Sequence, residues 1–296
     1  MKTYILYNHL AGHGGSEAQS KTLAAKYTGE VVCKNITEIT DYAALLGELD
    51  AQDNLIVCGG DGTLNRFANA IAGLDCKCNL LYYAVGTGND FLKDIGREVG
   101  SDPVSVKPYL ENLPEVEVNG EKHLFLNGVG YGIDGYCCEV GDRMKATSDK
   151  PVNYTAIAIK GLLFHYKPKN AVVTVDGKEY RYKKVWIAAT MKGRYYGGGM
   201  MNAPAQDRLS ENGEVTLVLF YGKGKIKTLI AFPSIFKGEH VKMTNMVAVH
   251  TGKEITVRFE QPAPLQIDGE TVLNVSEYRV SAKAKVKVKA EEPATV

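Results

Sequence analysis

The chain has 296 residues, of which 45% are hydrophobic and 23% charged, a composition typical of a globular protein with one large or two modest domains. The formal net charge of +1 at pH 7 excludes bulk electrostatic attraction as the main means of binding, so we expect no nucleic-acid partner. No apolar stretch approaches the ~18–20 residues of a spanning helix, and the amino terminus does not resemble a signal peptide. The six cysteines match no disulfide scaffold. We therefore expect a cytoplasmic protein whose contact with a membrane, where it occurs, is peripheral.

The first part of the chain alternates short apolar runs with helical patterns. Strands are predicted at residues 4–7, 31–33, 54–58 and 80–84, and helices at 41–48 and 64–72. Strands separated by helices predict a parallel sheet with right-handed crossovers. We expect residues 1–118 to form this α/β domain.

After about residue 113 the pattern becomes that of antiparallel strands. Asp176-Gly177 favours a type I′ turn between two strand patterns. Strands are predicted at residues 172–175, 179–182, 185–190, 215–220, 254–259 and 278–288, and helices at 153–165 and 225–236. We expect residues 119–290 to form a β-rich antiparallel sandwich, residues 291–296 to be a tail, and a cleft to separate the two domains.

The most informative segment is Gly59-Gly60-Asp61-Gly62-Thr63, which follows a predicted buried strand and precedes a predicted helix. Glycines let backbone N–H groups approach phosphate oxygens, and the helix dipole favours their negative charge. A carboxylate in such a loop would repel phosphate directly, so Asp61 is predicted to bind Mg²⁺ or to order the waters around it. A tight turn with a solvated aspartate is the alternative.

Two other glycine loops follow predicted strands. In residues 86–91, Thr87 and Asn89 can donate to phosphate, while Asp90 can orient an acceptor or share the metal. A plain helix N-cap is the alternative for this loop. The loop that begins at Gly12 lies between the first strand and the first helix and is predicted to cover a nucleotide.

In the second half, Asp268-Gly269-Glu270 places two carboxylates around a glycine at the end of a strand. Phosphoryl transfer to an alcohol requires a proton acceptor near the attacking oxygen, and Glu270 is the candidate. A hairpin turn is the alternative. The chain has no GxxxxGK[ST] motif and lacks the protein-kinase motifs, so both of those classes are excluded.

Together these motifs resemble the diacylglycerol kinase catalytic family, which includes soluble bacterial diacylglycerol and YegS-like lipid kinases and the sphingosine and ceramide kinases. The similar segments are residues 59–65, 86–91, 125–134, 197–205 and 268–270. The resemblance implies a nucleotide site between the two domains, ATP with Mg²⁺ as the donor, a lipid hydroxyl as the acceptor and Glu270 as the base.

The chain departs from the family pattern at three places. The family usually begins NP-x-SG, whereas Asn8 is followed here by His9. The signature usually continues LNE, but Arg66 replaces the glutamate and could engage phosphate instead. Some bacterial members carry an aspartate-rich structural metal loop, which residues 207–213 resemble loosely.

The candidate site residues form three groups. The candidate catalytic residues are Glu270, Asp61 and Asp90. The candidate nucleotide-binding residues are Asn8, Gly12, Gly59, Gly60, Gly62, Thr63, Asn65, Arg66, Gly86, Thr87 and Asn89. The candidate metal ligands are Asp61, Asp268 and Asp207.

The predicted function is an ATP-dependent lipid kinase that meets a diacylglycerol-like alcohol transiently at a membrane surface. Residues 223–237 mix lysines with large apolar residues, as an interfacial element or an ordinary packed helix would. An NAD kinase-like enzyme, which also uses GGDGT, and an inactive nucleotide-binding regulator are the alternatives. A homodimer is compatible with the sequence.

Overall fold

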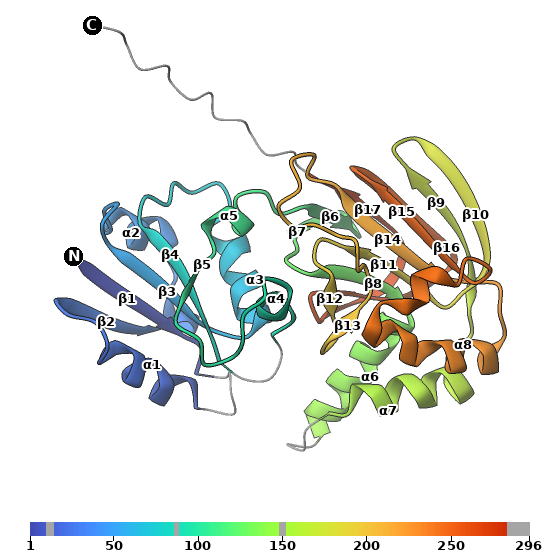
Figure 1. The fold of residues 1–296 in the computed structure, drawn as a ribbon, viewed down its shortest axis with the longest axis horizontal. Coiled ribbons are helices and arrows are strands. Elements are labelled where there is room, and N and C mark those ends of the chain that lie inside the picture. Colours follow the sequence, from blue (N-terminus) through green and yellow to red (C-terminus); the bar gives the residue numbers. More distant parts are fainter. Residues whose placement is uncertain (10–14, 86–88, 148–151, 283–296) are drawn as a thin grey trace, which may run out of the picture.

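The computed structural model describes residues 1–9, 15–85, 89–147 and 152–282. These residues form an N-terminal domain with a mostly parallel sheet and a C-terminal domain with an antiparallel sandwich, side by side along the long axis (Figure 1). The predicted fold class is therefore confirmed. Among the described residues, no helix is both long and apolar enough to cross a membrane.

The N-terminal domain contains a five-stranded sheet and its helices. Its elements are β1 (Lys2–Tyr7), α1 (Ser16–Ala24), β2 (Glu30–Asn35), the 3-10 helix η2 (Ile36–Glu38), α2 (Tyr42–Gly47), β3 (Asn54–Gly59), α3 (Asp61–Ala70), β4 (Asn79–Ala84), α4 (Asp90–Asp94), β5 (Val104–Ser105) and α5 (Lys107–Leu110). The strand order is β2-β1-β3-β4-β5, with parallel pairing except between β4 and β5.

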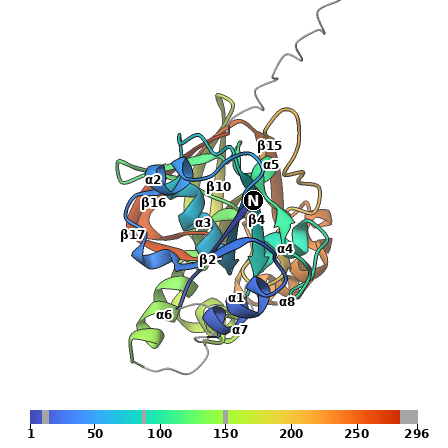
Figure 2. The same ribbon diagram turned by 90° about the vertical axis from the view of Figure 1, so that its left-hand side faces the viewer.

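Successive side chains along each strand point to opposite faces of the sheet, so that an apolar layer forms on each face. Tyr4 and Leu6 of β1 belong to a core that also contains residues of α2, α3 and α4, whereas Ile5 packs on the opposite face with Leu23 of α1. The helices therefore cover both faces of the sheet, as expected for parallel strands. Figure 2 shows this domain toward the viewer.

The C-terminal domain contains the remaining long strands. Its elements are β6 (Glu115–Val118), β7 (Glu121–Leu124), β8 (Gly128–Gly132), α6 (Ile133–Thr147), α7 (Tyr154–Lys160), the π-helical turn η3 (Gly161–His165), β9 (Lys169–Val175), β10 (Lys178–Val185), β11 (Ile187–Met191), β12 (Tyr195–Tyr196), β13 (Met200–Met201), β14 (Val215–Phe220), α8 (Lys225–Ala231), the 3-10 helices η4 (Phe232–Lys237) and η5 (Glu239–Lys242), β15 (Val247–Gly252), β16 (Glu254–Ile267) and β17 (Glu270–Ser281).

The sandwich is one sheet of ten strands that folds over its own core. Its order is β15-β14-β11-β8-β16-β17-β6-β7. In addition, β9 pairs with β16, and β10 pairs with β9. The long strand β16 pairs with β9 through its first half and with β8 through its last residues, so it belongs to both layers. The outer face of β11 and β14 packs against α6, α7, α8 and η4, which lie below the sandwich in Figure 1.

Several local predictions can be compared with this fold. The type I′ hairpin is confirmed, because Asp176 and Gly177 have φ angles of 47° and 83° between β9 and β10. The first sheet ends with β5 and the second begins with β6, so the chain passes from one sheet to the other before the predicted division at residue 118. The predicted strand at residues 278–288 and the tail at 291–296 extend beyond the described residues.

Helix α6 was not predicted. Its sequence contains Gly135 and Gly141, which weaken a helical pattern. A Cβ on Gly135 would lie 2.0 Å from the carbonyl oxygen of Pro264, so this glycine lets the helix approach the sheet. Tertiary packing therefore overrides the low helix propensity.

Candidate functional site at the junction of the two domains

The glycine loop joins β3 to α3 at the carboxyl end of the parallel sheet. A Cβ on Gly59 would lie 2.6 Å from Cβ and Oγ1 of Thr63, so only glycine fits there. Gly60 is the extended N-cap of α3, and its carbonyl accepts from the N–H of Thr63 at 3.0 Å. Asn8, at the end of β1, donates through Nδ2 to Thr63 Oγ1 at 3.0 Å. The structure thus brings these predicted nucleotide-binding residues together.

Asp61 is the first residue of α3 and is buried. Its Oδ2 accepts from the N–H of Phe91 at 3.1 Å and from Nδ2 of Asn127 at 2.8 Å. Its Oδ1 is also buried but has no hydrogen-bond partner among the described residues. Burial raises the pKa of Asp61 to about 7, and the nearby carboxylates of Asp90 and Asp268 add to the rise. A buried carboxylate oxygen without a donor fits a divalent cation.

Asp90 begins α4 and approaches the same site. Its Oδ2 accepts from the N–H of Gly198 at 2.8 Å, and burial raises its pKa. The hydroxyl of Tyr82 lies 2.9 Å from the carbonyl oxygen of Gly59 and 3.1 Å from Oδ1 of Asn89, which ties the two loops together. Gly86 and Thr87, like Gly12, lie outside the described residues.

The Asp268-Gly269 pair forms a hairpin turn between β16 and β17, with φ angles of 47° and 93°. The Asp268 carboxylate accepts from the backbone N–H groups of Leu126, Asn127 and Gly128. These three hydrogen bonds favour a role for Asp268 in holding residues 126–128 over its predicted role as a metal ligand. The hairpin alternative is therefore correct, and Asp268 also lies in the wall of the cavity described below.

Asn65 connects the two domains. Its Nδ2 donates to Oδ2 of Asp268 at 2.8 Å and to the carbonyl oxygen of Leu124 at 3.0 Å. Its side chain thus joins α3 to the second domain, because the hairpin turn supplies a buried acceptor opposite this face of the helix, and its nucleotide-binding role stays a prediction.

Glu270 is the first residue of β17, and its side chain is 57% exposed. Arg66 on α3 donates from Nη2 to Oε1 of Glu270 at 2.5 Å. Arg66 was predicted to engage phosphate, but here it faces the candidate base across the junction.

A cavity of about 500 Å³ contains Asp61, Asp90, Asp268 and Glu270 in its wall. Asp61 and Asp90 come from the N-terminal domain, whereas the other two come from the sandwich. Much of the remaining wall is apolar and comes from α6, α7 and η4, with residues Ile133, Ala158, Phe232 and Phe236, together with Val152 and Met200. The cavity therefore combines clustered carboxylates with an apolar part of its wall.

The sequence did not predict several polar residues in this wall, among them Asn127, Asp134 and Tyr196. Asn127 binds Asp61, as described above, and Asp134 accepts from the hydroxyl of Tyr196 at 2.8 Å. Burial raises the pKa of Asp134 to about 7. Asn127 and Asp134 lie within the segment 125–134 that resembles the family, but no spacing rule singles them out.

Asp207 does not reach this cavity. It lies in the wall of a second cavity of about 400 Å³, and its Oδ1 accepts from the N–H of Leu209 at 2.9 Å. Within the described residues, no group of three or more histidine, cysteine, aspartate or glutamate side chains could hold a metal ion. Asp207 therefore stays a predicted metal ligand that lies apart from the cavity containing Asp61.

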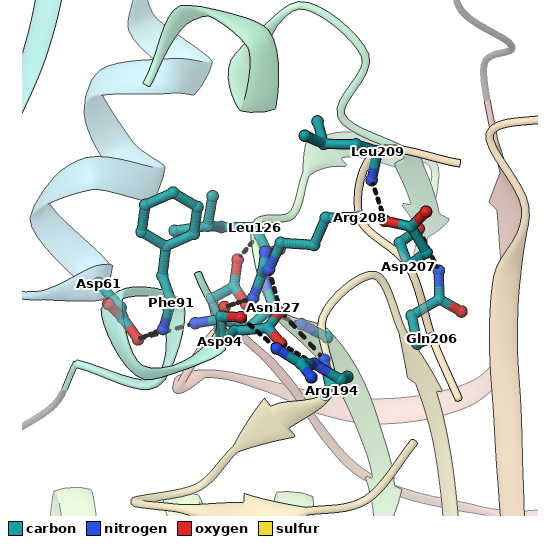
Figure 3. A network of polar contacts seen from close by, with 12 residues as sticks. Asp61, Phe91, Asp94, Leu126, Asn127, Arg194, Gln206, Asp207, Arg208 and Leu209 are labelled. Carbon is teal, nitrogen blue, oxygen red and sulfur yellow. Dashed lines mark hydrogen bonds and ion pairs between the residues drawn. The ribbon is translucent and has the colours of Figure 1, made fainter. Parts of the chain in front are cut away.

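A polar network behind Asp61 connects the two domains (Figure 3). Asp94 of α4 pairs with Arg194 Nε at 2.6 Å and with Arg208, and both arginines belong to the sandwich domain. Arg208 also donates to Oδ1 of Asn127. This network could not be predicted, because Asp94 is 100 and 114 residues away from its two arginine partners and the pairs match no motif.

Comparisons with known protein families match both domains. Residues 2–114 match the diacylglycerol kinase catalytic domain, and residues 127–287 match the YegS C-terminal NAD kinase beta sandwich-like domain. The chain is 26% identical over 273 residues to a diacylglycerol kinase of Mycobacterium tuberculosis, which covers 88% of this chain and 85% of that protein. It is 25% identical over 237 residues to a diacylglycerol kinase of Bacillus subtilis, with 77% and 75% covered.

Solved structures share the fold. Two structures from Bacillus anthracis have TM-scores of 0.68 and 0.58 at 19% and 18% identity, and the second is that of a diacylglycerol kinase. The first covers 96% of this chain and 92% of its own, and the second covers 95% and 93%.

Proposed function

This chain belongs to the diacylglycerol kinase catalytic family, and on that basis we propose that it transfers the γ-phosphoryl group of ATP to the hydroxyl of diacylglycerol or a similar lipid alcohol. The observation that carries this proposal is the cavity between the domains, whose wall combines the carboxylates of Asp61, Asp90 and Glu270 with apolar side chains of α6, α7 and η4. A lipid alcohol has the matching polarity, with a hydroxyl at one end and acyl chains at the other.

The glycine loop supports binding of the donor phosphates. The close packing of Gly59 on Thr63 sets the turn, and the first N–H groups of α3 have no partner within the helix. These N–H groups and the helix dipole attract phosphate oxygens. Asn8 holds the Thr63 hydroxyl, which keeps the loop in this shape.

Asp61 and Asp90 would hold Mg²⁺. The free Oδ1 of Asp61 and the buried carboxylate of Asp90 provide hard oxygen ligands of the kind that Mg²⁺ prefers. When bound, the ion supplies positive charge that neutralises the phosphate oxygens. The raised pKa of both carboxylates has the same origin, because burial penalises the charged form of each.

Glu270 accepts the proton of the attacking hydroxyl. It lies in the wall of the same cavity, and its exposure leaves it accessible to an acceptor that enters from outside. Arg66 holds the carboxylate in place before the acceptor arrives. An exposed ion pair of this kind contributes only about 0–1 kcal/mol, so an incoming hydroxyl can displace it.

The surface beside the apolar part of the cavity wall supports access from a membrane. Phe164 of η3 and Ile226 and Ile230 of α8 are 71%, 70% and 75% exposed. The two elements touch, since Lys225 Nζ donates to the carbonyl oxygen of Leu163 at 2.8 Å. The neighbouring lysines are Lys160, Lys167, Lys223, Lys225 and Lys227. Exposed apolar side chains with lysines around them favour binding to an anionic bilayer.

One assay separates this proposal from its alternatives. Purified protein is incubated with Mg²⁺ and ATP labelled at the γ-phosphate, with diacylglycerol in mixed micelles, with glycerol or with NAD. We expect label in the lipid product alone. Label in NADP would favour an NAD kinase-like enzyme, and ATP binding without transfer to any lipid or alcohol would favour an inactive regulator. The Asp61→Asn variant controls for a contaminating kinase.

A further inference from the structure

Arg208 is a buried cation at the junction of the domains. Its side chain is 6% exposed and faces the 2% exposed side chain of Asp94. Arg194 also donates to Asp94, through Nε at 2.6 Å. The single carboxylate of Asp94 therefore pairs with two guanidinium groups, and Arg208 still has donors to direct elsewhere.

Those donors determine the orientation of Asn127. Arg208 Nη2 donates to Oδ1 of Asn127, and Nη1 donates to the carbonyl oxygen of Leu126 at 2.5 Å. A guanidinium can only donate, so the Asn127 amide must present its oxygen to Arg208 and its NH₂ group to the other side. That NH₂ group donates to Oδ2 of Asp61 at 2.8 Å.

Arg208 also contacts the second donor to Asp61. Its Cζ lies 4.9 Å from the centre of the Phe91 ring, a cation–π distance. The backbone N–H of Phe91 donates to the same Oδ2 of Asp61 at 3.1 Å. Arg208 therefore supports both groups that occupy Oδ2, while Oδ1 has no partner among the described residues.

The space for this guanidinium is tightly enclosed. A Cβ on Gly193 would lie 2.0 Å from Nη2 of Arg208 and 2.9 Å from Oδ2 of Asp94. The N–H groups of Lys192 and Gly193 donate to the carbonyl oxygen of Asn127 at 2.9 and 3.1 Å. The same short loop thus confines Arg208 and holds the backbone of Asn127.

We propose that Arg208 is a positioning residue for Asp61: it orients Asn127 and supports Phe91 so that Oδ2 is occupied and Oδ1 is kept free for the metal that accompanies the nucleotide. The inference rests on the proposed role of Asp61. It adds that a residue 147 positions along the chain, in the other domain, sets the geometry of that ligand.

The test is a double-mutant cycle on metal binding. Mn²⁺ binding in the presence of ADP is measured by electron paramagnetic resonance for wild type, Arg208→Met, Asn127→Ala and the double variant. We expect each single variant to bind Mn²⁺ about 10–100-fold more weakly, as is usual when a residue behind a ligand is lost. Because Arg208 acts largely through Asn127, the double variant should be little weaker than the weaker single variant.

Arg194→Met is the matched control. It removes the other guanidinium from Asp94, but within the described part of the chain Arg194 donates to Asp94 and not to Asn127 or Phe91, so Mn²⁺ binding should be unchanged. Thermal unfolding is measured for every variant. If Arg208→Met does not fold, Arg208→Lys replaces it in the cycle, because lysine keeps a charge beside Asp94 but lacks the planar fork that reaches Asn127.

Three results would overturn the proposal: additive losses in the cycle, unchanged Mn²⁺ affinity in the Arg208 variant, or an equal loss in Arg194→Met. Failure of the proposed function has a different signature. Wild type that binds no Mn²⁺ with ADP would contradict the role of Asp61, and absence of lipid phosphorylation with normal Mn²⁺ binding would contradict only the acceptor.

Discussion

At the scale of single residues, Asp61 and Glu270 have different environments and should fail in different ways when replaced. Asp61 is buried and held by two N–H donors, whereas Glu270 is exposed and held by one arginine. A metal ligand and a proton acceptor are expected to differ in this way, because only the second must meet the incoming acceptor.

Asp61→Asn keeps the shape of the side chain, and its amide oxygen can still accept from Phe91 and Asn127. We therefore expect an unchanged melting temperature and a kcat lowered by about 10²–10³-fold or more, because the charge that attracts the metal is lost. Steady-state kinetics at saturating Mg²⁺ and circular dichroism measure the two quantities. Unaltered turnover would remove Asp61 from the mechanism.

Glu270→Gln should leave ATP binding unchanged but lower phosphoryl transfer by roughly 10²–10⁴-fold, the usual effect of losing an acid–base group. ATP affinity is measured by calorimetry and transfer by product formation. Arg66→Gln serves as the control, since it removes the partner and leaves the base. If ATP affinity collapses in Glu270→Gln, the assignment of the base is wrong.

Asp134 makes the free energy of unfolding depend on pH. Burial raises its pKa to about 7, so the folded protein retains a proton that the unfolded chain loses above its ordinary pKa. The stability from this group is therefore complete below about pH 4 and is lost as the pH rises through about 7, by on the order of 4 kcal/mol. Urea unfolding of Asp134→Asn should show a smaller decline from pH 4 to pH 7 than wild type. Identical declines would show that Asp134 does not titrate in this range.

The candidate residues that belong to sequence motifs could be predicted. The residues that hold these side chains in position could not. Asp61, Asp90 and Glu270 were predicted from glycine loops and a turn, and all three lie in the wall of one cavity. Asn127, Asp94 and Arg208 could not be predicted, because their importance depends on contacts between distant parts of the chain. The contact of Asn65 with Asp268 was not predicted for the same reason.

At the scale of elements, α6 illustrates how packing overrides local preference. Gly135 of this helix lies against the backbone of Pro264, whereas Gly47 of α2 has no neighbouring atom within 4 Å of the position of an added Cβ. The first glycine is required by contact between a helix and a strand, which no local pattern predicts.

Gly135→Ala should lower the free energy of unfolding by at least about 1–3 kcal/mol, because an added methyl group forces α6 away from β16. Gly47→Ala is the matched control and should be neutral or stabilising by up to about 1 kcal/mol. Denaturant unfolding measures both changes. Equal effects of the two substitutions would contradict the close approach of α6 to the sheet.

The surface of α8 should control binding to bilayers. Replacing Ile226 and Ile230 together with glutamine removes exposed apolar area and should weaken binding to vesicles of phosphatidylglycerol and phosphatidylcholine by about tenfold or more. Leu273→Gln is the control, since Leu273 is 51% exposed but lies on β17. Vesicle sedimentation gives the affinities, and equal binding by both variants would show that α8 does not face the membrane.

At the scale of the whole molecule, the two architectures were predictable but their junction was not. Alternating strands and helices predicted the parallel sheet, and turn signals such as Asp176-Gly177 predicted antiparallel pairing. The relative placement of the domains depends on Asn65, Asp94, Arg208 and the hairpin turn at Asp268. These contacts join residues of two different domains, so they produce no periodic pattern in the sequence.

The central claim is that Asp61 and Glu270, from different domains, act on one nucleotide and one acceptor. A crystal structure with Mn²⁺, a non-hydrolysable ATP analogue and a short-chain diacylglycerol tests this most directly. We expect an anomalous Mn²⁺ peak at Oδ1 of Asp61 and the acceptor hydroxyl beside Glu270 in the same cavity. A metal peak elsewhere, or an acceptor hydroxyl remote from Glu270, would contradict the account.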